Sequence, residues 1–148
     1  MGLFDKVKSL ANAITGNAAK VSVTAAPVTM GEPFEVTVQA VANDSDVNFS
    51  RVYVEVRGVE SIDVPSTSSD DDNRVYRSET TYTAELNVTG AGTLAAGANE
   101  SWTGEVTIPL NAPAIYRGKY AEHVYEVRAG LDCPGNDPDS GWVRVHLA

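Results

Sequence analysis

Apolar side chains near the start of the chain recur with the period of an α-helix. One face of a helix over residues 3–15 would carry Leu3, Phe4, Val7, Leu10 and Ile14. Gly16 follows this stretch, and glycine tolerates the left-handed conformation that ends many helices. A helix of this length is only marginally stable on its own in water. The pattern therefore predicts an amphipathic helix within residues 1–17, which would dock on its own domain, a second copy, another protein or a lipid surface.

The apolar period changes to two after Lys20. Seven stretches alternate apolar and polar residues, at positions 21–25, 34–40, 51–57, 82–88, 102–108, 125–131 and 143–147. A short eighth piece would come from Arg74–Arg77 at a sheet edge. Each stretch has one apolar face, which is typical of antiparallel sheets that are packed on one side.

Turn-forming residues separate these stretches at regular intervals, as in 30–33, 90–92 and 134–138. No alternation of strand and helix patterns points to a parallel sheet. The sequence therefore predicts an all-β fold, an immunoglobulin-like antiparallel β-sandwich of seven to eight strands over residues 18–148. The polar segment Ser61–Asn73 is expected to be a long loop.

The formal net charge is −9 and is unevenly distributed along the chain. Residues 1–20 hold three lysines and one aspartate, a net of +2, whereas residues 21–148 hold 8 basic and 19 acidic residues, a net of −11. Phosphate backbones are bound by clustered lysine and arginine, so the acidic body argues against nucleic acid as a partner. Lys6 and Lys8 flank the apolar stripe of the predicted helix, which leaves weak contact with a membrane surface open.

The sequence also bears on the cellular compartment. No apolar run approaches the roughly 18 residues that a membrane-spanning helix needs, and no apolar signal region is visible near the N-terminus. Cys133 is the single cysteine and cannot form an intramolecular disulfide. We therefore expect a cytoplasmic protein.

Residues that could support catalysis are few. His123 and His146 are the two imidazoles, and both are expected at the rim or surface of the sandwich. Cys133 is expected to be a structural thiol, because its nearest charged neighbour is Asp132 rather than a cation. The sequence contains no nucleophile elbow, phosphate-binding loop or paired-histidine metal motif. We therefore predict a protein that is not an enzyme and has no cofactor.

One turn is rich in oxygen ligands of the kind that calcium prefers, and it contains Asp132, Asn136, Asp137 and Asp139. Its spacing departs from that of a helix–loop–helix calcium loop. Aspartate and asparagine are also common in turns for backbone reasons alone. A calcium- or lipid-responsive binding module is therefore kept as an alternative function.

The densest cluster of basic and aromatic residues precedes the sixth predicted strand, and it consists of Tyr116, Arg117, Lys119 and Tyr120. Tyrosine and arginine are frequent anchors of protein interfaces. In the alternative interpretation, the tyrosines pack back on the sandwich and the charges are solvated. We predict that this segment and the apolar face of the N-terminal helix contact protein partners, among them a second copy of the chain.

Several segments resemble arrestin-like proteins. Met30–Val36 is similar to the Gly-Glu-x-hydrophobic entry into an early arrestin strand, although Thr37 stands where glycine is common. Val52–Gly58 resembles the strand that follows. Pro113–Tyr120 and then His123–Asp132 resemble the arrestin segment in which a proline, a glycine and a strand lead to an acidic residue. Within this group, the chain is most similar to the bacterial and archaeal sporulation-control family, whose members also open with a short amphipathic stretch.

The resemblance implies an arrestin-like β-sandwich that acts as a non-enzymatic adaptor, scaffold or regulatory module. It supplies no catalytic residues. These families usually have two sandwiches, whereas 148 residues provide room for one, and the polar core switch of animal arrestins has no counterpart here. A β-sandwich subunit of a larger assembly remains a further alternative function.

Overall fold

The computed structural model describes residues 18–65 and 74–148, and this part of the chain is all β. Its ten strands are β1 (Ala19–Ala25), β2 (Pro33–Ala42), β3 (Val47–Phe49), β4 (Val52–Pro65), β5 (Arg74–Thr89), β6 (Gly92–Leu94), β7 (Asn99–Thr107), β8 (Tyr116–Arg117), β9 (Ala121–Leu131) and β10 (Val143–Arg144). All ladders between these strands are antiparallel, so the predicted fold class is confirmed. The predicted helix within residues 1–17 lies outside the described residues.

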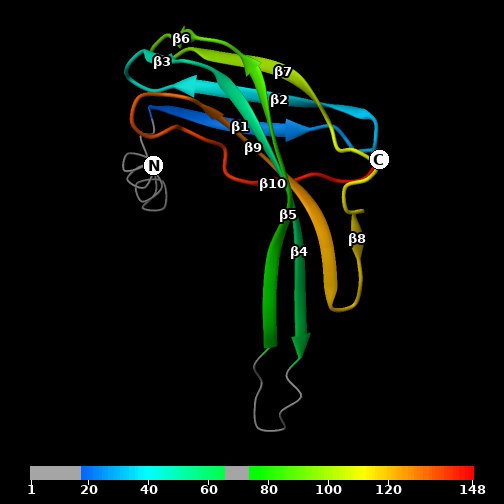
Figure 1. Ribbon diagram of the computed structural model, residues 1–148. Coiled ribbons are helices and arrows are strands. Elements are labelled where there is room, and N and C mark those ends of the chain that lie inside the picture. Colours follow the sequence, from blue (N-terminus) through cyan, green and yellow to red (C-terminus); the bar gives the residue numbers. More distant parts are fainter. Residues whose placement is uncertain (1–17, 66–73) are drawn as a thin grey trace.

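The first layer of the sandwich is a three-stranded sheet in the order β1-β2-β7. Its middle strand alternates buried and exposed side chains, with Phe34, Val36, Val38 and Ala40 facing inward. In Figure 1 this sheet runs across the top of the molecule. The two-residue period in the sequence therefore marks which side of the sheet faces the core.

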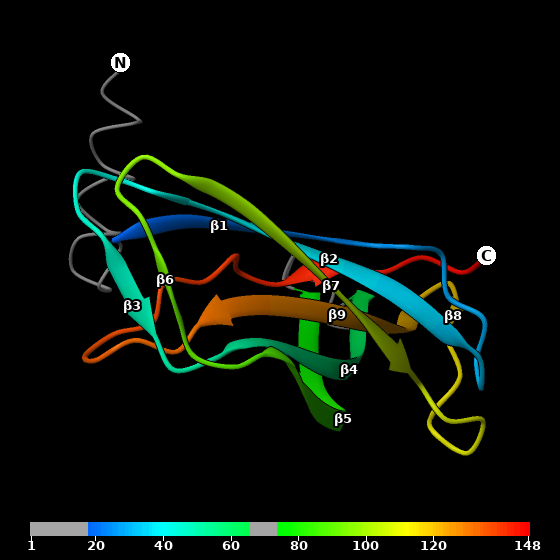
Figure 2. The ribbon, with the colours of Figure 1, turned by 90° about the horizontal axis from the view of Figure 1, so that it is seen from above.

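The second layer has the strand order β10-β9-β4-β5, and β8 pairs with the beginning of β9. Figure 2 shows β9 and β4 lying beneath the first layer. Where the layers overlap, β4 and β9 run along the strands of the first sheet in Figure 2, and in Figure 1 β4 and β5 then turn away from that sheet. Inward side chains from both layers form one valine-rich core, with Val54, Tyr125, Val127 and Leu131 fully buried in the second sheet.

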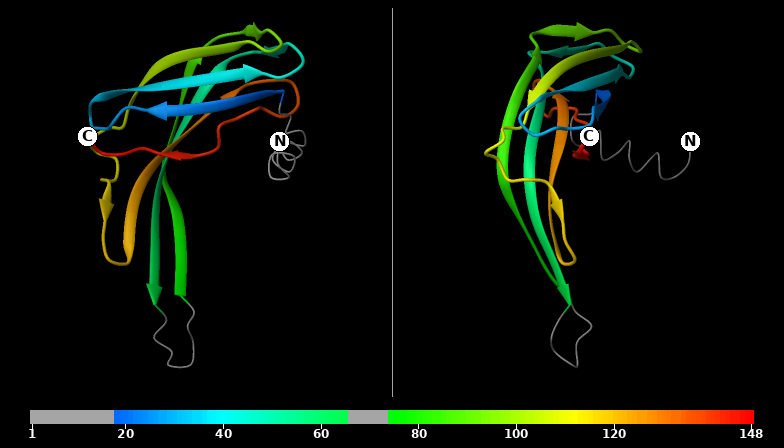
Figure 3. Two further views of the ribbon diagram at one scale, coloured as in Figure 1. Left: turned by 180° about the vertical axis from the view of Figure 1, so that it is seen from behind. Right: turned by 90° about the vertical axis from the view of Figure 1, so that its right-hand side faces the viewer.

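The β4–β5 hairpin is longer than its apolar alternation predicts. Ser61–Pro65 was expected to lie in a loop, but it continues β4 and pairs with Arg74–Ser78 of β5. Figures 1 and 3 show that β4, β5 and β9 continue well beyond the three-stranded sheet. We call this projecting part the arm, and it comprises residues Val59–Pro65, Arg74–Thr81 and Tyr116–Val124.

Two smaller features also differ from the sequence prediction. The short β3–β6 pair was not predicted, and of its residues only Gly92 falls in a segment that the sequence marked as a turn. Of the last predicted strand, 143–147, only Val143 and Arg144 form β10, and the amide of Val145 adds one hydrogen bond to the carbonyl of Tyr125 in β9 at 3.0 Å. The chain then changes partner, because the amide of Val28 donates to the carbonyl of His146 at 2.8 Å and the amide of Ala148 donates to the carbonyl of Val28 at 2.9 Å. Within residues 18–65 and 74–148, no helix has the length and hydropathy needed to cross a membrane.

Candidate functional site

The structure places the basic–aromatic cluster on the arm. Tyr116 and Arg117 form β8 and lie opposite His123 and Glu122 of β9, respectively. Lys119 and Tyr120 lie in the turn that joins the two strands. The amide of Gly118 donates to the carbonyl of Ala121 at 2.7 Å and closes this turn. The predicted cluster is therefore part of a short hairpin at the edge of the sheet.

The turn is attached to the β4–β5 hairpin by its backbone. The amide of Asp63 donates to the carbonyl of Tyr120 at 2.8 Å, beyond the point where the β4–β9 ladder ends. Asp63 also accepts a 2.6 Å hydrogen bond from Nε of Arg74 across the hairpin. A hollow of about 250 Å³ lies between these elements and is lined by Ser61, Asp63, Arg74, Tyr76 and residues 117–122.

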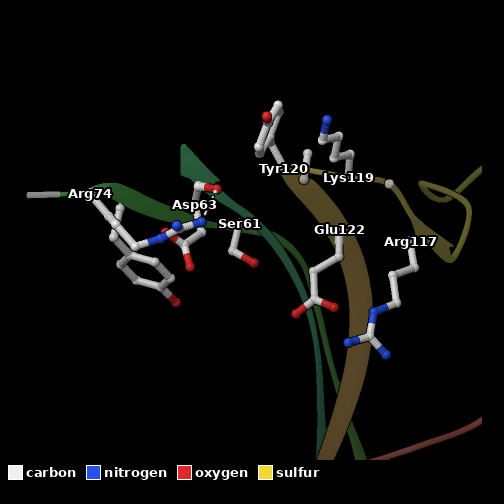
Figure 4. Close-up of a pocket in the computed structure, with 10 residues that line it drawn as sticks. Ser61, Asp63, Arg74, Arg117, Lys119, Tyr120 and Glu122 are labelled. Atoms are coloured by element: carbon white, nitrogen blue, oxygen red, sulfur yellow. Dashed lines mark hydrogen bonds and ion pairs between the residues drawn. The ribbon is translucent and has the colours of Figure 1, made fainter. Parts of the chain in front are cut away.

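Figure 4 shows that the side chains around this hollow point in two directions. Arg117, Glu122 and Ser61 extend to one side of the ribbon, whereas Lys119 and Tyr120 extend to the other. Glu122 is paired with Arg144 at 3.3 Å, and the Lys119 ammonium lies 5.2 Å from the centre of the Tyr120 ring. Arg117 and Lys119 form no ion pair with another described residue. The hairpin therefore carries two cations without ion pairs to described residues, one on each side of the ribbon, together with two half-exposed tyrosine rings.

Exposed apolar side chains are concentrated on the arm. Five of the eight large hydrophobic residues that are exposed in the described part of the chain lie there, namely Ile62, Val75, Tyr76, Tyr116 and Tyr120. Tyr116 and Tyr120 are 44% and 41% exposed, so neither ring is packed back into the sandwich core. An exposed group of apolar and aromatic side chains rimmed by charges is typical of a protein contact surface.

A charged ladder on the outer face of the second sheet escaped the sequence analysis. Arg128 donates to both oxygens of Glu55 at 3.0 Å, and Arg57 donates to Glu126 at 2.9 Å, across the β4–β9 pair. The ring of Trp142 stacks on both arginines, with guanidinium carbons 4.0 and 4.6 Å from its centre. The signal was present in the sequence as Glu-x-Arg on both strands, because antiparallel pairing places each Glu opposite an Arg.

His123 was expected at the rim, but its side chain is 1% exposed. The difference arises because β9 begins at Ala121, so residue 123 lies inside the sheet between β4 and β8. Its Nε2 lies 2.6 Å from the hydroxyl of Thr81, an extra residue in β5 where the register with β4 shifts. Its Nδ1 has no hydrogen-bond partner among the described residues. A histidine base needs an orienting acceptor at that atom, so the Thr81–His123 pair is incomplete as a nucleophile–base pair.

The acidic side chains of the turn that was considered as a calcium site form hydrogen bonds with other parts of the protein. Asp132 accepts from Arg51 at 3.2 Å, and Asp139 accepts from the amide of Gly141 at 2.8 Å. Asp137 accepts from the hydroxyl of Tyr53 at 2.9 Å and from the amide of Cys133 at 3.0 Å. Among the described residues, no group of three or more His, Cys, Asp or Glu side chains is placed to hold a metal ion.

The same turn covers the side chain of Tyr53 on the outer face of the second sheet. The two-residue alternation of the sequence had placed Tyr53 on the polar side of its strand. Tyr53 is 6% exposed, and burial together with its hydrogen bond to Asp137 raises its pKa. The pKa of the Cys133 thiol is also raised, first by burial and then by Asp137 and Asp132. A thiol of this kind is a poor nucleophile, in agreement with the structural role predicted for Cys133.

The other predicted contact surface is the apolar helix face of Leu3, Phe4, Val7, Leu10 and Ile14, and all five residues lie outside the described part. His146 is exposed, as predicted. The structure therefore brings together only the Tyr116–Tyr120 part of the predicted site, and it adds Asp63, Arg74 and Tyr76 from the hairpin.

Comparison with known proteins yields a structural likeness. No protein-family model and no curated protein sequence matches the chain. Among solved structures, the chain is similar to Spo0M, a sporulation control protein from Bacillus subtilis, with a TM-score of 0.61 and 22% sequence identity. The match covers 88% of this chain and 49% of Spo0M, so the chain spans about half the length of that protein. The likeness confirms the arrestin-like β-sandwich that the sequence resemblance implied.

Proposed function

We propose that this chain is a cytoplasmic, non-enzymatic regulatory protein that binds other proteins through its arm. The observation that carries the proposal is the concentration of exposed apolar and aromatic side chains on the arm. The sandwich orders the strands, while the arm presents their ends to solvent. Spo0M is a sporulation control protein, and the structural likeness to it is consistent with a regulatory role for this chain.

The chemistry of the arm indicates what kind of partner it would take. Tyr116, Tyr120 and Tyr76 offer large ring surfaces that lose little conformational entropy on binding. Arg117 and Lys119 offer cations that are free of ion pairs with other described residues. The expected partner therefore presents apolar side chains together with carboxylates.

The proposal can be tested by affinity purification of the full chain from its native cell, followed by repetition with purified components. A Y116A/Y120A variant should lose the captured partner, whereas Leu110→Ala should retain it. Leu110 is the matched control because it is 78% exposed and lies off the arm. Deletion of residues 1–16 separates the arm from the predicted helix. If that deletion abolishes capture while Y116A/Y120A retains it, the helix is the contact surface and the arm proposal is wrong.

A further inference from the structure

The outer edge of β5 is long and open. Within the described residues, β5 pairs with β4 on one side and has no strand on the other. The side chains from Arg74 to Thr81 are all exposed. Edge strands of this kind are templates for a further strand, unless proline, bulges or misplaced charges prevent pairing. Here the register shift at Thr81 ends the regular edge on its sandwich side, which leaves Arg74–Thr80 without proline or bulge.

Charges on this edge are not balanced within one molecule. Glu79 lies directly opposite Glu60 of β4, and like charges at opposite positions destabilise an antiparallel pair. Arg77 lies on the same face, opposite Ile62. None of Arg77, Glu79 and Glu60 forms an ion pair with another described residue. An added strand that brings a cation to Glu79 and a carboxylate to Arg77 would satisfy both.

A second copy of this strand meets that requirement. Two identical strands that pair antiparallel about a two-fold axis must place one residue opposite its own copy. An axis at Arg77 or Glu79 would place like charges together, and an axis at Tyr76 would leave Glu79 outside the paired stretch. An axis at Ser78 places each Arg77 opposite the Glu79 of the other copy, twice over, and Tyr76 opposite Thr80.

We propose that two copies of this chain associate by antiparallel pairing of their β5 edges, with Ser78 of one copy facing Ser78 of the other. The second sheets of both copies then form one continuous sheet across the dimer. The inference goes beyond the adaptor role and does not depend on it. It uses the backbone edge and the charges of β5, whereas the adaptor role centres on the tyrosines and cations of the Tyr116–Tyr120 hairpin, and Tyr76 is the one residue named for both.

The central test reverses the charges on the β5 edge. The molar mass in solution is measured by sedimentation and light scattering at protein concentrations from micromolar to millimolar. The wild-type chain should reach twice the monomer mass. Arg77→Glu and Glu79→Arg should each weaken self-association by about tenfold to a hundredfold, because each reversal turns two attractive pairs into repulsive ones. The R77E/E79R double variant should recover the wild-type affinity. A mixture of R77E and E79R chains should form the mixed dimer, since every contact then joins opposite charges.

Lys20→Glu is the matched control, because Lys20 is an exposed cation on β1, an edge strand of the other sheet. It should leave self-association unchanged. Circular dichroism confirms the fold of each variant. A wild-type chain that stays monomeric at every concentration overturns the proposal, and so does an R77E chain that dimerises as the wild type does.

Cross-linking tests the register independently of charge. In a Cys133→Ser background, Ser78→Cys should form a disulfide-linked dimer under mild oxidation, because opposite Cα atoms in antiparallel sheets lie about 4.5–5.5 Å apart. Thr80→Cys is the control in the same strand, since its two copies would be offset by about 13 Å at the rise of a β-strand. Equal cross-linking at both positions, or none at Ser78→Cys, would exclude this register.

Discussion

The two halves of the β4–β5 hairpin have the same backbone pairing but different surroundings. Between Val52 and Gly58, β4 lies under the three-stranded sheet and its inward side chains are buried. Beyond Val59 the ladder continues to Pro65, while the side chains on both strands become largely exposed. The sandwich thus buries apolar surface, which is the main source of stability. The arm depends on hydrogen bonds and a few ion pairs, so it is free to carry contact residues.

The largest difference between the two regions should appear when an aliphatic side chain is shortened. Leu131→Ala removes a fully buried side chain of the core and should lower the free energy of unfolding by about 2–5 kcal/mol. Ile62→Ala on the arm, where the residue is 36% exposed, should cost less than about 1 kcal/mol. Urea unfolding measures both. Equal losses would mean that the arm belongs to the same cooperative core.

The junction between sandwich and arm should tolerate no added bulk. A Cβ at Gly58 would lie 2.9 Å from Cε1 of Tyr125, 3.0 Å from Oγ1 of Thr81 and 3.2 Å from Cε1 of His123. Gly58→Ala should therefore destabilise the protein by about 1–3 kcal/mol. Gly90→Ala is the control, since a Cβ there meets nothing within 4 Å, and it should stay within about 0.5 kcal/mol of wild type. Thermal and urea unfolding measure the stability of the two variants and show whether the tightly packed region includes Gly58.

Alkaline pH should destabilise the sandwich through its buried tyrosines. Burial raises the pKa of Tyr125 and, together with Asp137, that of Tyr53. The folded state then holds these protons more tightly than the unfolded state. The stabilisation is complete below the ordinary tyrosine pKa of about 10 and declines as pH rises above it. Urea unfolding at pH values from about 8 to about 11, which span the ordinary tyrosine pKa, should show this decline in the free energy of unfolding.

Phenylalanine variants assign the effect to the sandwich. Tyr125→Phe should lose about 1 kcal/mol at neutral pH, because its hydroxyl donates to the carbonyl of Pro113 at 2.6 Å, and should show a shallower alkaline decline. Tyr76→Phe on the arm, where the ring is 66% exposed, should follow the wild-type curve. A wild-type protein whose stability is constant to pH 11, about one unit above the ordinary pKa, would contradict the raised values.

The smallest expected effects concern ion pairs. Glu55→Gln breaks the half-buried pair with Arg128, whose side chains are 28% and 32% exposed, and should cost at most about 1 kcal/mol. Asp63→Asn breaks the exposed pair with Arg74 on the arm, and its cost should be close to zero, below about 0.5 kcal/mol. Both costs should shrink in high salt. A larger loss for Asp63→Asn would show that this pair holds the arm together.

Much of the sandwich could be predicted from the sequence. Alternation along 34–40 and 125–131 correctly identified which side chains of β2 and β9 face the core. Apart from the short edge piece expected at Arg74–Arg77, the arm could not be predicted in this way, because residues 59–65 and 74–81 have no covered face to select apolar residues. Their charges and hydroxyls were interpreted as a loop at Ser61–Asn73, although the backbone of 61–65 pairs as regularly as that of the core.

The candidate site shows the same division. The composition of Tyr116–Tyr120 marked it as a contact segment, and the structure leaves its tyrosines about half exposed. Asp63, Arg74 and Tyr76 were not predicted as members of the site, because they approach the turn only through the hairpin that carries them. Residues 1–17 lie outside the described part, so the predicted helix remains a prediction.

The sequence by itself determined the all-β class and the inward faces of the strands, because the two-residue period is a local property of an extended backbone. Only the tertiary structure decided which strands pair and what covers each outer face. Tyr53 is buried by Asp137, 84 residues further along the chain, and His123 meets Thr81 at a distance of 42 residues. Such contacts depend on how the sheets close over one another, and no local pattern encodes that closure.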